Sequence, residues 1–454
     1  MTSAAKSTKQ LPENRQQIQL SFAPLVKQAA PAVVNVYTKQ KVKKQVRSPL
    51  FDDPFFKQFF GDRFGFRSPK QRQQQSLGSG VIIDPSGLIV TNHHVIQGAE
   101  EIKVALSDRR EFTAELVLED EDTDLAVLRI DTAGSTLPHL QLRDSDNVQV
   151  GDLVLAIGNP FNVGQTVTSG IVSAVARTSV GVADFQSFIQ TDAAINPGNS
   201  GGALVSMDGK LVGVNTAIFS KSGGSLGIGF AIPANMVRVV VNSAKSGLSF
   251  VQRPWLGVAT QPVTAEIASS LGLSRPEGTL VRAIYKDGPA DDAGLEVGDL
   301  ITALDDVSVS NANTLKFRLG TKRIGGRVKF TVLRDGKQKN LYLNLIRAPE
   351  TPARDLRLLK GEHPFAGAEV ANLSPALAEE LGIDTFARGV IVTRIRTGSL
   401  AAQVRLRPGD IFLTVEDQKI DSAKTLQRVM SQPLEQWRVS IRRGKKNISV
   451  VLGE

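Results

Sequence analysis

Cysteine is absent from this sequence of 454 residues. Its absence excludes thiol catalysis, disulfide scaffolds and cysteine-based metal sites, but cysteine-free chains occur in reducing and oxidising compartments alike. No apolar run approaches the roughly 20 residues that a membrane-spanning helix needs. The sequence also lacks the phosphate-binding G-x-x-x-x-G-K-[S/T] loop and the zinc-binding H-E-x-x-H motif. We therefore expect no ATP-driven unfolding, no metal site and no cofactor.

Basic residues are in excess only near the N-terminus. Residues 1–80 contain 14 lysines and arginines against four acids, a charge of +10, so the remaining residues sum to −1. Without a recognition motif, this distribution predicts no specific nucleic-acid binding, although the basic segment could contact anionic membrane surfaces weakly. Residues 1–21 are a tail without the apolar stretch of a secretory signal. Either the chain is cytosolic, or its signal peptide was removed and Met1 was added for expression.

Phenylalanine is concentrated in the segment 39–76, which we interpret as an insertion loop. Seven phenylalanines lie within 51–66, among basic residues and glutamines. A mobile loop is one interpretation of this composition. We favour an interaction surface, because so many aromatic rings are not expected to stay in contact with water.

Short strands dominate the chain from residue 78 to about 244. Runs such as 80–84, 125–130 and 211–218 are rich in β-branched residues and are separated by turn residues. Many short strands without long helices between them predict an all-β barrel or sandwich. A strand is also expected over 31–37, and the pattern of 235–246 predicts a closing helix.

The C-terminal part of the chain contains an internal repeat. The strings that begin at Gly278 and Gly298 recur at Gly389 and Gly409, with the same offset of 111 residues. A constant offset of this kind predicts two copies of one domain. The segment 347–360, with its prolines and arginines, is expected to link them.

The string N-P-G-N-S-G-G-A contains a candidate nucleophile, Ser200. A serine hydroxyl is a weak nucleophile that needs an adjacent base. It also needs backbone N–H groups directed at the developing oxyanion, and flanking glycines allow the tight backbone that this requires. A glycine-rich turn without catalytic function is the alternative interpretation of this string.

Histidine and aspartate residues supply partners for this serine. His93 and His94 follow a predicted strand, and because successive strand residues point to opposite faces, we expect one to face the serine and the other to lie at the surface. In the acidic run 119–124, Asp124 directly precedes the apolar strand 125–128. A carboxylate in that place is positioned to orient a partly buried imidazole. The order His, Asp, Ser is that of chymotrypsin-type barrels.

The motifs T-N-x-H-V, T-D-L-A and N-P-G-N-S-G-G-A-L are followed by two repeats with G-x-L-V and A-G-L-x-x-G-D. In these motifs the chain resembles the HtrA (Deg) serine proteases, from about Phe22 to the C-terminus. The resemblance implies that His94 is the base, that Asp124 orients it and that Ser200 is the nucleophile. It assigns the oxyanion hole to Gly198, Asn199 and Ser200, with the N–H groups of Gly198 and Ser200 as donors. His93 stands where the family usually has asparagine, and we expect no catalytic role for it.

The resemblance also implies a cellular role. Substrates would be unfolded or misfolded envelope proteins, and the location would be the bacterial periplasm, which favours a removed signal peptide. Protease domains would form trimers that can join into larger cages. The short, cysteine-free insertion loop resembles the DegQ-like branch of the family more than the DegP-like branch.

The specificity pocket is expected to be small and apolar. Ala194 stands six residues before Ser200, where trypsin-like enzymes carry a charged specificity group. The other candidate lining residues are Ile195, Asn196, Thr216, Ala217, Ile218 and Ile228. Such a pocket should accept valine, alanine or isoleucine and reject lysine and arginine, because an unpaired buried cation is costly.

The two repeats resemble PDZ domains, which bind extended C-terminal peptides by strand addition. The candidate carboxylate-binding loops are Trp255, Leu256, Gly257 and Val258 in the first repeat and Phe365, Ala366, Gly367 and Ala368 in the second. Domains that only pack are the alternative. The second repeat departs from the family pattern at Val404 and Arg405, where the first has Ala293 and Gly294, and its peptide binding is less well supported.

These observations predict a mainly β protein with a chymotrypsin-like double β-barrel protease domain followed by two PDZ domains. The expected boundaries are a tail over 1–21, the protease domain over 22–250, PDZ domain 1 over 253–346, a linker over 347–360 and PDZ domain 2 over 361–454. We predict an ATP-independent serine endopeptidase. The alternative is a peptide-binding chaperone or scaffold with latent or secondary proteolysis.

Overall fold

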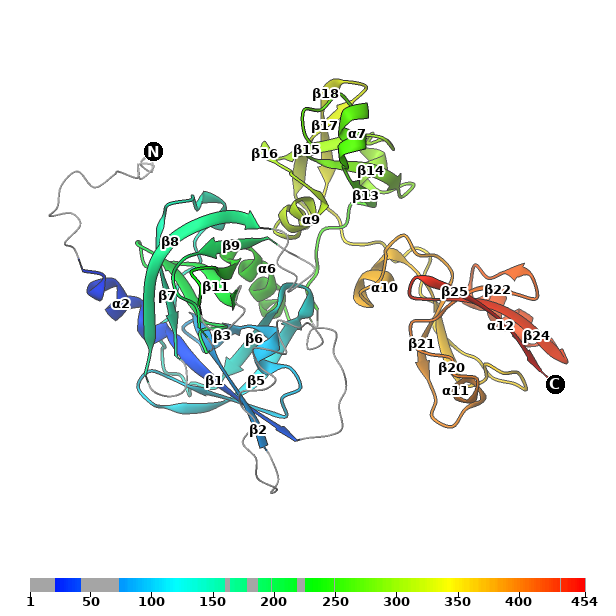
Figure 1. Ribbon diagram of the computed structural model, residues 1–454. Coiled ribbons are helices and arrows are strands. Elements are labelled where there is room, and N and C mark those ends of the chain that lie inside the picture. Colours follow the sequence, from blue (N-terminus) through cyan, green and yellow to red (C-terminus); the bar gives the residue numbers. More distant parts are fainter. Residues whose placement is uncertain are drawn as a thin grey trace. The chain divides into compact units, whose positions relative to one another are not determined.

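The computed structural model describes residues 21–41, 73–159, 164–177, 187–196, 198–218, 225–248, 250–432 and 434–453 (Figure 1). It divides into two compact units, Met1–Val251 and Gln252–Glu454. The phenylalanine-rich segment 51–66 lies outside the described residues. None of the described helices is long and apolar enough to cross a membrane.

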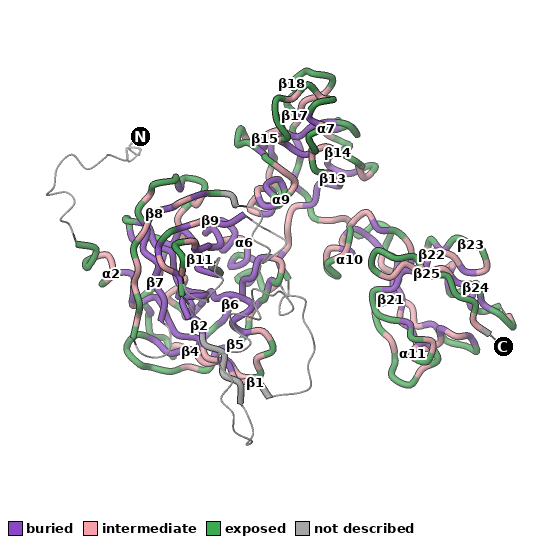
Figure 2. Tube along the Cα trace, viewed as in Figure 1, coloured by how far each residue is buried: buried purple, intermediate pink, exposed green. Residues whose placement is uncertain are grey.

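Two closed six-stranded barrels form the first unit, so of the two architectures that the strand pattern allowed, the barrel is the one present. The first barrel has the order β1-β2-β3-β6-β5-β4. Its strands are β1 (Val33–Lys41), β2 (Gln73–Asp84), β3 (Leu88–Thr91), β4 (Glu101–Ala105), β5 (Glu111–Asp120) and β6 (Leu125–Ile130). Their β-branched and leucine side chains fill the barrel, and Figure 2 shows the buried residues along the strands.

The second barrel has the order β10-β11-β12-β9-β8-β7. Its strands are β7 (Leu153–Gly158), β8 (Thr166–Arg177), β9 (Phe188–Thr191), β10 (Ala203–Ser206), β11 (Leu211–Ile218) and β12 (Gly229–Pro233). Short helical elements accompany the barrels: α2 (Ala23–Ala29), η1 (Ala30–Ala32), α5 (His93–Ile96), η3 (Glu121–Thr123) and η4 (Ser145–Asn147). The helix expected over 235–246 is present as α6 (Ala234–Lys245), which buries its apolar face.

The second unit contains two sheets of one topology, which confirms the repeat. The first, repeat one, has the order β13-β14-β15-β17-β18 with β16 beside β15. Its elements are β13 (Val258–Pro262), α7 (Ala265–Ser270), β14 (Thr279–Ile284), α8 (Pro289–Asp292), β15 (Leu300–Leu304), β16 (Val307–Ser308), α9 (Ala312–Gly320), β17 (Arg327–Arg334) and β18 (Lys337–Asn344).

The second sheet, repeat two, has the order β19-β20-β21-β22-β24-β25 with β23 beside β22. Its elements are β19 (Arg357–Leu358), β20 (Ala368–Asn372), α10 (Pro375–Glu380), β21 (Val390–Ile395), α11 (Leu400–Gln403), β22 (Ile411–Val415), β23 (Gln418–Lys419), α12 (Ala423–Met430), β24 (Gln436–Arg443) and β25 (Lys446–Gly453). Strands β21 and β22 lie 111 residues after β14 and β15. Repeat two differs by the additional strand β19.

An ion pair between an arginine and a buried aspartate explains the Gly-Asp string that recurs in both repeats. Asp299 and Asp410 are each 1% exposed. The guanidinium of Arg334 donates to both carboxylate oxygens of Asp299 at 2.6 Å. Arg443 contacts both oxygens of Asp410 in the same way, at 2.6 and 2.5 Å. A buried carboxylate with a bidentate arginine is compensated, and removing one partner leaves an uncompensated charge.

Arg443→Met should therefore destabilise repeat two by about 3–5 kcal/mol. Trp437 lies in repeat two, and the only other tryptophan is Trp255, so Trp437 fluorescence in a Trp255→Phe background follows the unfolding of repeat two by urea. Arg438→Met, on the same strand but with a side chain 63% exposed, is the matched control and should cost less than about 1 kcal/mol. Equal losses for the two variants would contradict the assignment.

Candidate active site

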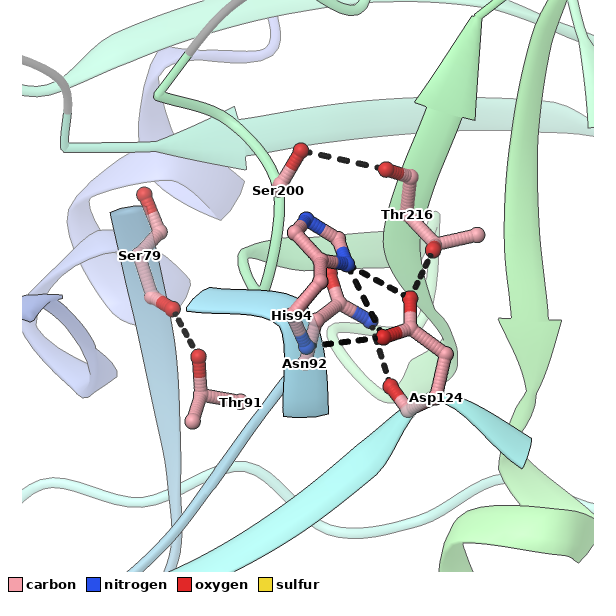
Figure 3. A network of polar contacts seen from close by, with 7 residues as sticks. All are labelled: Ser79, Thr91, Asn92, His94, Asp124, Ser200 and Thr216. Atoms are coloured by element: carbon pink, nitrogen blue, oxygen red, sulfur yellow. Dashed lines mark hydrogen bonds and ion pairs between the residues drawn. The ribbon is translucent and has the colours of Figure 1, made fainter. Parts of the chain in front are cut away.

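The candidate catalytic side chains come from both barrels and meet within one polar network (Figure 3). His94 on α5 and Asp124 before β6 belong to the first barrel, and Ser200 before β10 belongs to the second. All three are buried, with exposed fractions of 8%, 3% and 8%. The structure thus brings together the three residues that the sequence singled out.

Asp124 has an unusual backbone conformation. It follows η3 in the left-handed region, with φ 56° and ψ 40°, which aspartate tolerates better than most residues. Its carbonyl oxygen accepts hydrogen bonds from the side chain of Asn92, at 3.0 Å, and from the N–H of His93, at 3.1 Å. These bonds fix the peptide, so that the carboxylate points at the imidazole of His94.

The Asp124 carboxylate is held by donors from both barrels. Nδ1 of His94 lies 2.9 Å from Oδ1 and 2.8 Å from Oδ2, and the His94 N–H donates to Oδ1 at 3.0 Å. The hydroxyl of Thr216, on β11, donates to Oδ2 at 2.6 Å. We predicted Thr216 as a pocket residue, and its role as a partner of Asp124 was missed because no local pattern connects positions so distant in sequence.

The two histidines follow a strand, as predicted, but the alternation of strand residues does not extend to them. Strand β3 ends at Thr91, and His93 and His94 both belong to the single helical turn α5. The expectation that the second histidine lies at the surface is also wrong, since His93 is 7% exposed. Its Nδ1 lies 3.4 Å from a carboxylate oxygen of Glu119.

The hydroxyl of Ser200, the candidate nucleophile, is held by the backbone carbonyl of Thr216. Ser200 Oγ donates to the backbone oxygen of Thr216 at 3.1 Å, and Figure 3 shows the imidazole of His94 between Ser200 and Asp124. Thr216 therefore contacts the triad twice, through its hydroxyl and through its carbonyl.

The glycines around Ser200 permit close backbone packing, between the barrels at Gly201 and within the second barrel at Gly202. Gly201 has φ +83°, and a Cβ there would lie 2.0 Å from the backbone oxygen of Ser79. A Cβ on Gly202 would lie 2.3 Å from the oxygen of Ile157. Any side chain at either position would push the Ser200 loop away from its neighbours, which accounts for the S-G-G string.

The candidate oxyanion hole has two available donors. The N–H of Asn199 donates to the backbone oxygen of Asn196 at 3.0 Å. This N–H is therefore engaged, and the candidate donors to an oxyanion are those of Gly198 and Ser200. Gly198, with φ 94°, and Ser200 donate to no backbone oxygen among the described residues. Their N–H groups therefore remain available for a developing oxyanion.

Ser79 connects this loop to the first barrel. Its hydroxyl donates to the backbone oxygen of Gly198 at 2.5 Å and accepts from the N–H of Asn159 at 2.8 Å. Its own N–H donates to the backbone oxygen of Ser200 at 2.8 Å, and Thr91 Oγ1 donates to its carbonyl at 2.7 Å (Figure 3). Sequence reasoning missed Ser79, because a serine within a strand carries no recognisable signal.

The structure separates the predicted pocket residues. Ala194 and Ile228 are half-buried and Asn196 is exposed, whereas the Ile195 side chain is 1% exposed and belongs to the core of the second barrel. A buried side chain can form the wall of a pocket, so the assignment of Ile195 stays a prediction together with those of the other lining residues. Ala217 and Ile218 end β11, and their side chains lie outside the described part of the chain.

The candidate peptide loops occupy equivalent places in the two repeats. Loop one (255–258) leads into β13, and loop two (365–368) leads into β20. In repeat one, the outer edge of β13 carries no strand among residues 250–432. In repeat two, the outer edge of β20 pairs with β19.

Comparisons with known proteins agree with this geometry. A family model described as a trypsin-like peptidase domain matches residues 78–214, and one described as a PDZ domain matches residues 254–345. The chain is 39% identical to a probable periplasmic serine protease do/HhoA-like of Haemophilus influenzae, over 96% of this chain and 92% of that protein. It is 35% identical to the periplasmic serine endoprotease DegP of Escherichia coli, over 99% and 94% of the two chains.

A solved structure, the HtrA-type protease AlgW with decapeptide, is 48% identical, with a TM-score of 0.53. The match covers 73% of this chain and 99% of that chain. Taken with the buried His94–Asp124 pair beside Ser200, this likeness confirms the resemblance seen in the motifs. The chain belongs to the HtrA (Deg) family of periplasmic serine endoproteases.

Proposed function

We propose that this serine endoprotease cleaves unfolded or misfolded envelope proteins without ATP, using His94, Asp124 and Ser200. The contact between the carboxylate of Asp124 and Nδ1 of His94, at 2.8 Å, carries the proposal. It keeps the proton of the neutral imidazole on Nδ1, which leaves Nε2 as the acceptor on the side of Ser200. Because Asp124 is buried, water does not compete with His94 for hydrogen bonds to its carboxylate.

Catalysis would begin with transfer of the Ser200 proton to Nε2 of His94, as Oγ attacks the substrate carbonyl carbon. The imidazolium is stabilised by Asp124, whose own charge is held by the Thr216 hydroxyl. The oxyanion accepts hydrogen bonds from the N–H groups of Gly198 and Ser200. His94 then protonates the leaving amine, and a water molecule, activated by the same base, hydrolyses the acyl-enzyme.

Specificity would come from a small apolar pocket beside Ser200. Ala194 and the half-buried Ile228 offer no charge to a substrate side chain. We therefore retain the preference for valine, alanine or isoleucine before the scissile bond. The PDZ repeats would capture peptide segments of the same substrates by strand addition.

We also propose trimers built from protease units, as in the family, with larger cages as a further step. The protease unit carries exposed apolar side chains that an oligomer could cover, among them Phe22, Val150, Leu153 and Ile171. The assignment to the DegQ-like branch, and the role of the phenylalanine-rich segment in assembly, stay predictions. A binding-only chaperone is less well supported, because such a protein need not maintain the buried triad.

Ser200→Ala should reduce cleavage of β-casein by about 10³-fold or more without loss of folding, since triad members act as a unit. His94→Asn should be similarly inactive. His93→Asn is the matched control and should retain most activity, because the ion-pair contact of the His93 side chain is with Glu119 and not with a residue of the triad. Fluorogenic casein digestion gives the rates, and substantial activity in Ser200→Ala or His94→Asn would refute the assignment.

Ser79→Ala should lower kcat about 10- to 100-fold with little change in KM, because its hydroxyl orients the peptide that follows the Gly198 donor. Ser206→Ala removes another buried serine hydroxyl, on β10, and serves as the control, with unchanged kcat. Steady-state kinetics on a short chromogenic peptide separate kcat from KM. If the two variants lose thermal stability alike and both keep kcat, Ser79 has only a structural role.

Cleavage sites in β-casein should fall mainly after valine, alanine or isoleucine, because the pocket offers no partner for a charged side chain. Mass spectrometry of an early digest identifies these sites. Ala194→Asp introduces a carboxylate at the pocket position and should shift cleavage towards lysine and arginine. A majority of cuts after lysine or arginine in the wild-type digest would overturn the pocket assignment.

A further inference from the structure

One backbone contact is common to the two peptide loops. The carbonyl of Gly257 in loop one accepts from the N–H of Tyr285 at 2.8 Å, and the carbonyl of Gly367 in loop two accepts from the N–H of Arg396 at 2.9 Å. Both glycines have a positive φ, of 67° and 94°. The loops are therefore equivalent in structure, and they can be compared donor by donor.

Loop one has backbone donors to offer. The N–H groups of Leu256 and Gly257 donate to no backbone oxygen within the described residues. Strand β13, which follows, pairs with β14 on one side only. An extended peptide can add to such an edge while its terminal carboxylate takes the loop N–H groups.

Loop two has its donors engaged by the chain itself. The N–H of Gly367 donates to the carbonyl of Leu359 at 2.9 Å, and the N–H of Leu359 donates to the carbonyl of Ala368 at 2.9 Å. Strand β19, just before Leu359, runs antiparallel to β20, with Leu358 opposite Glu369. The last residues of the linker thus occupy the edge to which a peptide would add.

Side chains also hold this segment against α12. Leu359 is 1% exposed and belongs to the core cluster that contains Leu426 and Val429 of α12. The guanidinium of Arg357 lies 2.5 Å from the side-chain oxygen of Gln427, also on α12. The segment is therefore fixed to the helix as well as to the strand.

A buried histidine closes the turn between β19 and loop two. The N–H of Phe365 donates to Nδ1 of His363 at 3.2 Å, and the N–H of Ala366 donates to the carbonyl of His363 at 3.1 Å. His363 is 3% exposed, and burial lowers its pKa. The neutral ring can accept this hydrogen bond, so that each N–H of loop two is engaged within the domain.

We propose that residues 357–359 are the built-in ligand of the repeat two groove and exclude external C-terminal peptides from it. The Leu359 side chain takes the place of a peptide's terminal side chain, and its carbonyl oxygen takes the place of a carboxylate oxygen on the Gly367 N–H. Repeat one is then the repeat of this protein that binds external C-terminal peptides. The inference builds on the proposed peptide binding by PDZ repeats and assigns that role to one of them.

Hydrogen exchange tests the docked state without any ligand. The chain has no cysteine, so Leu358→Cys/Glu369→Cys gives a single disulfide that locks β19 onto β20. Amides of loop two in the wild-type full chain should exchange within about threefold of the locked form, and at least about tenfold more slowly than those of loop one. Arg438→Cys/Val451→Cys, a cross-strand pair between β24 and β25, controls for the effect of a disulfide.

Two results of this measurement would overturn the proposal. One is exchange in loop two as fast as in loop one. The other is a wild-type loop two that exchanges at least about tenfold faster than the locked form, since that would show a groove that is mostly open.

Peptide titration tests the exclusion itself. The probe is the hexapeptide R-D-L-R-L-L with a free carboxylate, which copies residues 354–359, titrated calorimetrically into Ser200→Ala protein so that it is not cut. The unlocked protein and both oxidised disulfide variants should bind one peptide per chain. Loss of a site on oxidation of Leu358→Cys/Glu369→Cys alone would show that repeat two was open.

Leu359→Ala weakens the built-in ligand and should reveal a second site. Trp437 fluorescence checks that repeat two still folds. If it does not fold, the Leu358→Cys/Glu369→Cys disulfide and the exchange measurement test the proposal without this variant. Absence of binding in every protein would refute peptide capture by repeat one, whereas the exchange rates of loop two would still decide the docked state. Failure of the proposed function and failure of this inference are thereby distinguished.

Discussion

The catalytic architecture depends on one buried charge. The Asp124 carboxylate is 3% exposed, and an ionised carboxylate at that depth is stable only when donors surround it. The first barrel supplies two of them through His94, and the second supplies one through Thr216. Because neither barrel alone satisfies the charge, the site is complete only when both have closed and docked.

This requirement explains features that seem unrelated in the sequence. The barrels must approach until the backbone oxygen of Ser79 almost touches Gly201, where a Cβ would lie 2.0 Å away. The same approach lets the Ser79 hydroxyl bond the backbone of Gly198. The glycines thus allow the docking that places Thr216 on Asp124, and the same docking orients the candidate oxyanion donors.

Sequence patterns predicted the residues of the site better than their local geometry. Asp124 was recognisable because it precedes an apolar strand, and Ser200 because of its glycines. The position of His93 was misjudged because strand alternation was extended into α5, and a single helical turn is too short to show a helical period. Thr216 and Ser79 act through contacts between barrels, which leave no trace in the local sequence.

In the C-terminal half, too, sequence patterns predicted the domains but not the contacts that distinguish them. The constant offset predicted two copies of one domain, and the substitution of Arg405 for Gly294 suggested a weaker second copy. The structure keeps a positive φ at both positions, 57° and 74°, so the backbone there is conserved despite the substitution. What distinguishes the repeats is β19, and a strand of two residues is too short for any periodicity.

An open sheet edge tends to be paired with another strand. It exposes unpaired N–H and C=O groups, which a further strand can satisfy. Repeat two fills its edge with the preceding linker, at no cost in translational entropy because that strand is already part of the chain. Within the part of the chain that the structure describes, repeat one has no such segment on β13, so the same stabilisation is left for a peptide from another molecule. The same fold can therefore be a structural domain in repeat two and a peptide-binding domain in repeat one. The difference is whether the segment before the domain pairs with its edge strand.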